Sequence, residues 1–197
     1  MEPEPDNTGG GKKTVNKSVT EQVQEVRILA EMIVFVAAAA TLHYLSRELL
    51  PFLHLPQGGS ITVASMVPIV WFALRRGLGW GLQAGIVFGL VNLALPGSYF
   101  EMNPIEIILD YPLAFGALGL AGIFRSKPAI GVSLGFLGRF VCHFLSGVVF
   151  FWMYAWEGWN PVLYSLVYNA SYIIPESIIS GIIIAILVKS KRLDIFL

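Results

Sequence analysis

The chain has 197 residues, of which 55% are hydrophobic and only 13% are charged, with 13 Lys+Arg balanced by 13 Asp+Glu. Soluble domains carry about 25% charged residues, so this composition indicates a membrane protein and excludes a nucleic-acid binder and most soluble enzymes. The single cysteine, Cys142, excludes a disulfide-stapled secreted module. About 20 apolar residues form one bilayer-spanning helix, so the chain has room for roughly five to seven spans.

The first predicted element is a flexible cytoplasmic N-terminal tail over residues 1–26. This stretch is polar, contains three consecutive glycines at 9–11 and has few large apolar residues. The apolar run that follows is long enough to cross a membrane, so we interpret it as a first membrane helix and not as a removed signal. A six-helix transmembrane domain over 27–190 and a short cytoplasmic C-terminus over 191–197 complete the predicted organisation.

Six apolar segments make up the predicted transmembrane domain, and glycine, proline and charged residues separate them. Strand-like alternation is absent and periodicity is weak, which is typical of membrane helices that are apolar on every side. The second and third segments are short for a 30 Å crossing and could be tilted, extended or incomplete spans. The segments are 28–44, 60–74, 80–95, 105–124, 130–152 and 162–188.

The basic residues predict the orientation of these spans. Eleven of the thirteen lie before the first span, between the second and third, between the fourth and fifth, or after the sixth. If all six spans are real, these positions share one side, and the positive-inside rule places both termini in the cytoplasm. The opposite loops are aromatic and acidic, which is typical of interfacial anchors and would also suit a cationic ligand with aromatic rings.

Ionisable residues inside spans are costly, so each one is a candidate functional residue. Asp110 lies about five residues past the outer end of the fourth segment, roughly 8 Å below the surface. Glu106 lies four residues earlier on the same helix face. The two acids could attract a buried cation, or they could be interfacial acids that reach water.

The fifth and sixth segments carry further polar residues at membrane depth. Arg139 and Glu176 lie at similar depths, so we predict a structural ion pair, because an unpaired mid-membrane charge costs several kcal/mol. His143 shares a face with Arg139 and could bond a ligand ring nitrogen or be satisfied by a neighbouring helix. A stripe of Tyr164, Tyr168 and Tyr172 could equally line a ligand or pack between helices.

Small residues in the third segment predict close helix packing. Gly81, Gly85 and Gly89 recur every four residues, so this face could dock inside the bundle or against a partner. Two common catalytic motifs are absent from the sequence, which has no phosphate-binding loop and no His-Glu-x-x-His. We therefore do not predict an enzyme.

Several motifs resemble the thiamine-specific S components (the ThiT type) of energy-coupling-factor vitamin transporters. They are GRFVCHFLSG (138–147), YAWEG (154–158), YSLVYN (164–169), LDYPLAF (109–115) and GLAG (119–122), and the resemblance covers about residues 28–190. It implies a six-helix, multi-pass cell-membrane protein that captures thiamine from outside. The implied partners are a transmembrane coupling subunit and two ATPase subunits that use the ATP, while this chain binds no cofactor of its own.

The resemblance also implies a ligand site. The family's acidic residue for the thiazolium, next to a tyrosine, falls on Asp110 and Tyr111, with Asp in place of Glu. The other polar binders of the family fall on His143, Tyr164 and Asn169.

Aromatic and docking positions follow from the same resemblance. A ring-stacking aromatic falls on Phe151, with Trp152 adjacent, and an aromatic pair falls on Phe88 and Tyr99; Phe151 and Phe88 each replace a tryptophan. The small-residue motif that docks the coupling subunit falls on Ala37 and Thr41, while the aromatic lid of the first loop is not assigned to a residue.

Thiamine is a cation with two aromatic rings and a hydroxyl, which suits one acidic group among aromatic side chains. The alternatives are an S component for riboflavin or a thiamine precursor, and a stand-alone secondary transporter or small membrane enzyme. The acidic group favours a cation over a neutral flavin.

Overall fold

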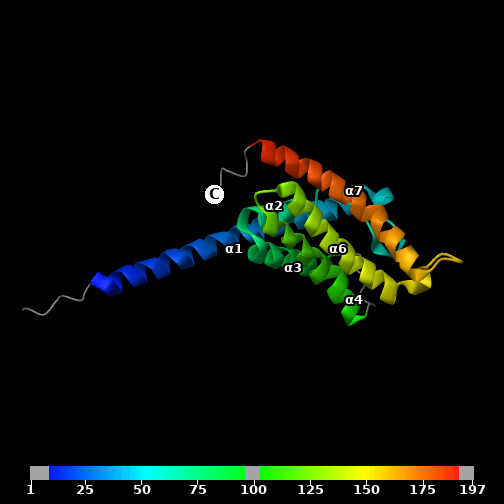
Figure 1. Ribbon diagram of the computed structural model, residues 1–197, viewed down its shortest axis with the longest axis horizontal. Coiled ribbons are helices and arrows are strands. Elements are labelled where there is room, and N and C mark those ends of the chain that lie inside the picture. The colour runs from blue at the N-terminus through cyan, green and yellow to red at the C-terminus, as the bar shows by residue number, and fades with distance from the viewer. Residues whose placement is uncertain (1–8, 96–102, 191–197) are drawn as a thin grey trace, which may run out of the picture.

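The computed structural model describes residues 9–95 and 103–190, and within them it is all-helical apart from one isolated bridge between His54 and Ser60. The helices are arranged side by side in one bundle (Figure 1). In chain order they are α1 (Gly9–Leu49), α2 (Val67–Arg76), α3 (Leu78–Ala94), a fourth helical segment of four consecutive parts, α6 (Pro128–Phe150) and α7 (Pro161–Lys189). We call this fourth helical segment the fourth row. The fourth row comprises α4 (Pro104–Ile108), the π-helical turn η3 (Leu109–Leu113), α5 (Ala114–Ala117) and the 3₁₀ stretch η4 (Leu118–Phe124).

The predicted all-α bundle of six helical segments is confirmed. Among the described residues, four helical stretches are long and apolar enough to cross a membrane, namely Val19–Leu49, Pro104–Phe124, Pro128–Phe150 and Pro161–Lys189. The segments predicted to be short are also the short helices, because α3 has 17 residues and α2 has only ten. The chain before α2 is irregular, with a positive φ of 63° at Ala64, and Pro68 lies in the first turn of the helix.

The N-terminal region differs from its prediction. The sequence predicts a flexible tail over residues 1–26, of which 1–8 lie outside the described residues. Gly9 to Val26 belong to α1, which extends away from the bundle (Figure 1). The region 12–27 has no proline or glycine, and it directly precedes a membrane helix. Extending an existing helix is far easier than nucleating one, so the polar segment continues the helix of the first span.

Helix α2 supplies much of the core despite its length. Ile69, Val70 and Phe72 are completely buried. At its C-terminal end, Arg75 and Arg76 both pair with Glu31 of α1, the Arg75 Nη1 to Glu31 Oε1 distance being 2.6 Å. These ion pairs tie α1 to the basic end of α2.

The glycine stripe of α3 packs inside the bundle, which decides between the two alternatives left by the sequence. A Cβ on Gly85 would overlap the backbone carbonyl of Phe115, and one on Gly89 would lie 2.5 Å from the carbonyl oxygen of Tyr111. Helix α3 and the fourth row therefore meet backbone to backbone. This contact holds the chain segment that follows Asp110.

At Asp110 the fourth row changes from an α-helix to the wider π-helix. Pro112 lies inside η3 and has no N–H to donate, so the regular α-helical hydrogen bonding cannot continue through this turn. Single π-helical turns of this kind are frequent at functional sites. The turn presents Asp110 and Tyr111 toward the cavity described next.

Candidate ligand-binding site

A cavity of about 870 Å³, open solvent at its mouth included, lies among α1, the loop that follows it, the fourth row, α6 and α7. Six of the predicted ligand residues line it: Asp110, Tyr111, His143, Phe151, Tyr164 and Asn169. These residues come from three separate segments, so only the folded bundle brings them together.

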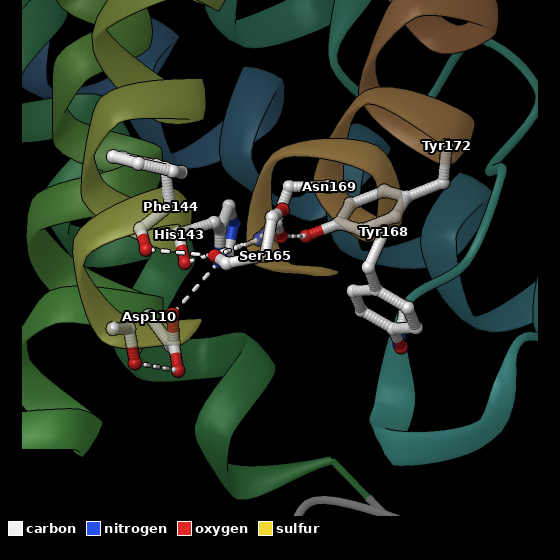
Figure 2. A network of polar contacts seen from close by, with 9 residues as sticks. Asp110, His143, Phe144, Ser165, Tyr168, Asn169 and Tyr172 are labelled. Atoms are coloured by element: carbon white, nitrogen blue, oxygen red, sulfur yellow. Dashed lines mark hydrogen bonds and ion pairs between the residues drawn. The ribbon is translucent and has the colours of Figure 1, made fainter. Parts of the chain in front are cut away.

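Asp110 is the acidic group of this cavity. Its Oδ1 atom is 2.8 Å from Nδ1 of His143 (Figure 2). Its Oδ2 atom accepts a hydrogen bond of 2.7 Å from the Ser146 hydroxyl. Both partners are on α6, one turn apart. The carboxylate is therefore held in one orientation beside the cavity.

His143 is oriented by this contact. A carboxylate can only accept, so Nδ1 of His143 carries the proton in the hydrogen bond to Asp110. The ring packs edge-on against Phe115 and Tyr172, with centroid distances of 6.5 and 6.0 Å. Its other nitrogen, Nε2, is buried and has no hydrogen-bond partner in the part of the chain that the structure describes. That nitrogen is available to a ligand.

Asn169 connects α7 to α6. Its amide nitrogen donates to the Ser165 carbonyl at 2.9 Å and to the His143 carbonyl at 3.3 Å, and its Oδ1 accepts from the Tyr172 hydroxyl at 2.7 Å (Figure 2). Ser165 in turn donates to the carbonyl of Phe144 at 2.8 Å. The amide is thus engaged by the protein, and it positions the histidine backbone as well as facing the cavity.

The tyrosine stripe of α7 closes the side of the cavity next to the first loop. Tyr164 and Tyr168 stack at 5.7 Å between ring centroids, and Tyr168 packs edge-on against Tyr172 at 5.8 Å. The Tyr168 hydroxyl accepts from the Gly59 N–H at 2.9 Å and donates to the carbonyl of Pro56. The stripe therefore lines the cavity and also holds the loop by hydrogen bonds.

The loop is held in a specific backbone conformation. Gln57 and Gly58 have φ values of 61° and 89°, a region that costs most residues energy but suits glycine. The Tyr164 hydroxyl lies 3.4 Å from the Gln57 side-chain oxygen, a long contact. We define residues 56–60 as the loop clasp.

Arg139 and Glu176 form an ion pair deep in the bundle. Both side chains are almost completely buried, and Glu176 also accepts a hydrogen bond from Thr62. The Arg139 guanidinium lies over the Phe115 ring, 4.9 Å from its centroid. The pair joins α6, α7 and the irregular chain before α2.

Three predicted ligand residues are not part of the cavity wall as the described residues form it. Phe88 is completely buried and packs edge-on behind Phe115 at 4.9 Å, so it supports the wall without facing the ligand. Trp152 lies beyond the end of α6 and is 57% exposed, because the helix stops at Phe150 and the chain turns. Tyr99 lies outside the described residues.

The two predicted docking residues, Ala37 and Thr41, lie on an exposed face of α1. Nothing in this chain covers that face at these positions, within the described residues. Their role in binding a partner stays a prediction.

Some residues of the site are not among the predicted ligand residues. Ser146, one turn from His143, carried a signal, because a hydroxyl at this spacing shares the histidine's helix face. His43 of α1 and Asn92 of α3 also line the cavity. Each is a polar residue inside an apolar helix, and polar residues of this kind identify the candidate functional residues of the fourth, fifth and sixth segments. The loop clasp carried no such signal, because its position depends on the tyrosines of a distant helix.

The site thus combines the oriented carboxylate of Asp110, the unpaired Nε2 of His143 and a wall of tyrosine and phenylalanine rings. Aromatic faces and a carboxylate both attract organic cations. Directional polar groups beside them would select among such cations. The arrangement suits a positively charged molecule with aromatic rings.

Comparison with known proteins gives a consistent result. The family model described as "Thiamine transporter protein (Thia_YuaJ)" matches residues 29–195. The chain is 36% identical over 185 residues to the thiamine transporter ThiT of Bacillus subtilis, covering 86% of this chain and 93% of that protein. It is 31% identical over 140 residues to the thiamine transporter ThiT of Lacticaseibacillus paracasei, covering 62% of this chain and 70% of that protein.

The fold agrees with a solved structure. The bundle superposes on ThiT from Listeria monocytogenes with a TM-score of 0.76 at 28% identity, covering 86% of this chain and 98% of that one.

Proposed function

The chain belongs to the thiamine transporter family, and on this premise we propose that it is the thiamine-binding S component of an energy-coupling-factor transporter. In this role the cavity binds thiamine from outside the cell. A transmembrane coupling subunit and two ATPase subunits then drive its release inside, since the sequence has no phosphate-binding loop of its own.

One observation carries the choice of ligand. Asp110 is an oriented carboxylate at the edge of a cavity whose walls are largely aromatic. A thiazolium ring is a permanent cation, and it would gain both a charge interaction with Asp110 and contacts with aromatic faces. A neutral flavin would make no charge interaction with Asp110. Nothing would then offset the free-energy cost of desolvating the carboxylate.

The proposed orientation follows from charge. The basic ends of α2 and α7 and the N-terminal region face the cytoplasm under the positive-inside rule, which puts the loop clasp and the cavity mouth outside. The exposed small residues Ala37 and Thr41 on α1 then form part of the surface that receives the coupling subunit. Co-purification of ATPase and coupling subunits with the tagged chain is the test of this assembly, and a chain that transports thiamine alone would contradict it.

Calorimetry of the purified protein tests the ligand. We compare thiamine with riboflavin and with 3-deazathiamine, in which an uncharged thiophene replaces the thiazolium. Asp110→Asn should weaken thiamine binding by about 10- to 100-fold, the usual effect of losing a charge-assisted interaction. The same variant should leave 3-deazathiamine binding nearly unchanged, because that ligand has no charge to lose.

Glu157→Gln is the matched control. Glu157 is an exposed acid in the loop between α6 and α7, so its loss should change neither affinity. Equal losses for both ligands in Asp110→Asn would refute the charge role of Asp110. Binding of riboflavin but not thiamine would refute the proposed substrate.

A further inference from the structure

The floor of the cavity, between α1 and α6, holds two buried polar side chains that the proposed thiamine contacts do not use. His43 is 6% exposed and Arg139 is 4% exposed, and both line the cavity. His43 Nδ1 and Arg139 Nε have no hydrogen-bond partner among residues 9–95 and 103–190. Buried polar atoms are nearly always paired, so each one needs an explanation.

The surroundings of these atoms are aromatic. His43 packs edge-on against Phe88 at 6.1 Å, Phe88 packs against Phe115 at 4.9 Å, and the Arg139 guanidinium lies over Phe115. Walls of this kind offer few other polar groups to the two side chains. Their partner must therefore enter through the cavity itself.

The chemistry of the two atoms restricts that partner. Arginine Nε–H can only donate, whereas a neutral histidine nitrogen can accept. The charge of Arg139 is already balanced by Glu176, so this ion pair offers the floor little net positive charge for an anion. A neutral group that both accepts and donates one hydrogen bond satisfies both atoms, and a hydroxyl is such a group.

We propose that His43 and Arg139 form a subsite for the hydroxyl of the ligand's hydroxyethyl arm. This inference rests on the proposed function, because thiamine carries a single hydroxyl. Arg139 Nε–H donates to the hydroxyl oxygen, and the hydroxyl donates to Nδ1 of His43. The thiazolium then lies near Asp110, with its hydroxyethyl arm directed at the floor between α1 and α6. The aminopyrimidine lies toward His143 and the tyrosine stripe.

The test compares thiamine with an analogue that carries an ethyl in place of the hydroxyethyl group. Wild-type protein should bind thiamine about tenfold more tightly than the ethyl analogue, the effect of one well-made hydrogen-bond pair in a buried site. His43→Phe keeps a ring against Phe88 but removes the polar atom. It should lower thiamine affinity to that of the ethyl analogue and change affinity for the analogue less than about twofold.

Two further variants complete the design. His43→Asn places an amide near the position of Nδ1 and should retain most of the preference for thiamine. His54→Phe is the control, because His54 is a histidine of the first loop that does not line the cavity. It should leave the preference unchanged.

Each outcome decides the question. Equal wild-type affinities for thiamine and the ethyl analogue would overturn the subsite and leave the proposed function standing. So would a loss in His43→Phe that is the same for both ligands, which would make His43 a structural residue only. Tighter binding of thiamine monophosphate than of thiamine would assign the floor to an oxyanion and overturn the hydroxyl. Failure of wild-type protein to bind thiamine at all would overturn the proposed function and the subsite with it.

Discussion

Two walls of the cavity are built in opposite ways. Behind Tyr111, the fourth row lies backbone to backbone on the glycine stripe of α3, with no space for even a Cβ at Gly85 or Gly89. Across the cavity, the loop clasp is held to α7 mainly by the hydroxyl of Tyr168. The first wall is held by close packing, which tolerates little change, and the second by a few hydrogen bonds. Close packing thus fixes the wall that carries the carboxylate, whereas a single tyrosine hydroxyl makes most of the hydrogen bonds of the other wall.

The Arg139–Glu176 pair lies beneath both walls, and breaking it should have the largest effect. Arg139→Glu or Glu176→Arg alone would leave two like charges buried together. We expect each to lower the free energy of unfolding by about 3–5 kcal/mol or to prevent accumulation of folded protein. Thermal unfolding of the detergent-solubilised protein measures this loss.

The double reversal is the critical comparison. Arg139→Glu combined with Glu176→Arg restores opposite charges, so it should recover part of the lost stability. Glu157→Arg, an exposed reversal, should have no effect. A double variant as unstable as either single variant would show that the two residues do not act as a pair.

Gly85→Ala tests the close-packed wall and should have the next largest effect. The added methyl would overlap the carbonyl of Phe115. The overlapping atoms are backbone atoms, which cannot rotate away as the end of a side chain can. We expect a loss of about 1–3 kcal/mol in the free energy of unfolding, measured by thermal denaturation. Thiamine affinity should fall as well, because the displaced segment carries Asp110 and Tyr111.

Gly79→Ala is the matched control on the same helix. A Cβ at Gly79 would meet no atom within 4 Å, so this variant should be neutral or slightly more stable. If the two alanine variants behave alike, the wall does not depend on close approach of the backbones.

The sequence predicts the contacts that depend on membrane depth. A buried charge needs a partner, and Glu176 lies at a depth similar to that of Arg139, so the ion pair could be inferred without a structure. The apolar segments likewise follow from hydropathy. Helix α1 does not begin where the composition changes from polar to apolar, because the polar residues before the span continue its helix toward the N-terminus.

Contacts that depend on the register between helices could not be inferred. The approach of Asp110 to His143 depends on the π-helical turn at Pro112, which rotates the fourth row by an amount that periodicity does not encode. The loop clasp depends on a tyrosine more than a hundred positions later, and nothing in residues 56–60 reveals that partner. The predicted aromatic at Trp152 failed to reach the cavity for a similar reason, since α6 ends at Phe150.

Tyr168→Phe tests the clasped wall and should have the smallest effect. The variant keeps the stacked ring but removes the hydroxyl that binds Gly59 and Pro56. Losing these hydrogen bonds should destabilise the thiamine-bound loop by about 1 kcal/mol, so thiamine should dissociate several-fold faster. Stopped-flow fluorescence measures the dissociation rate, and thermal stability without ligand should change little. Tyr154→Phe is the control, because Tyr154 is an exposed tyrosine after α6 that does not line the cavity. A Tyr168→Phe variant that loses stability as much as Gly85→Ala, with an unchanged dissociation rate, would mean that both walls are rigid and that thiamine enters elsewhere.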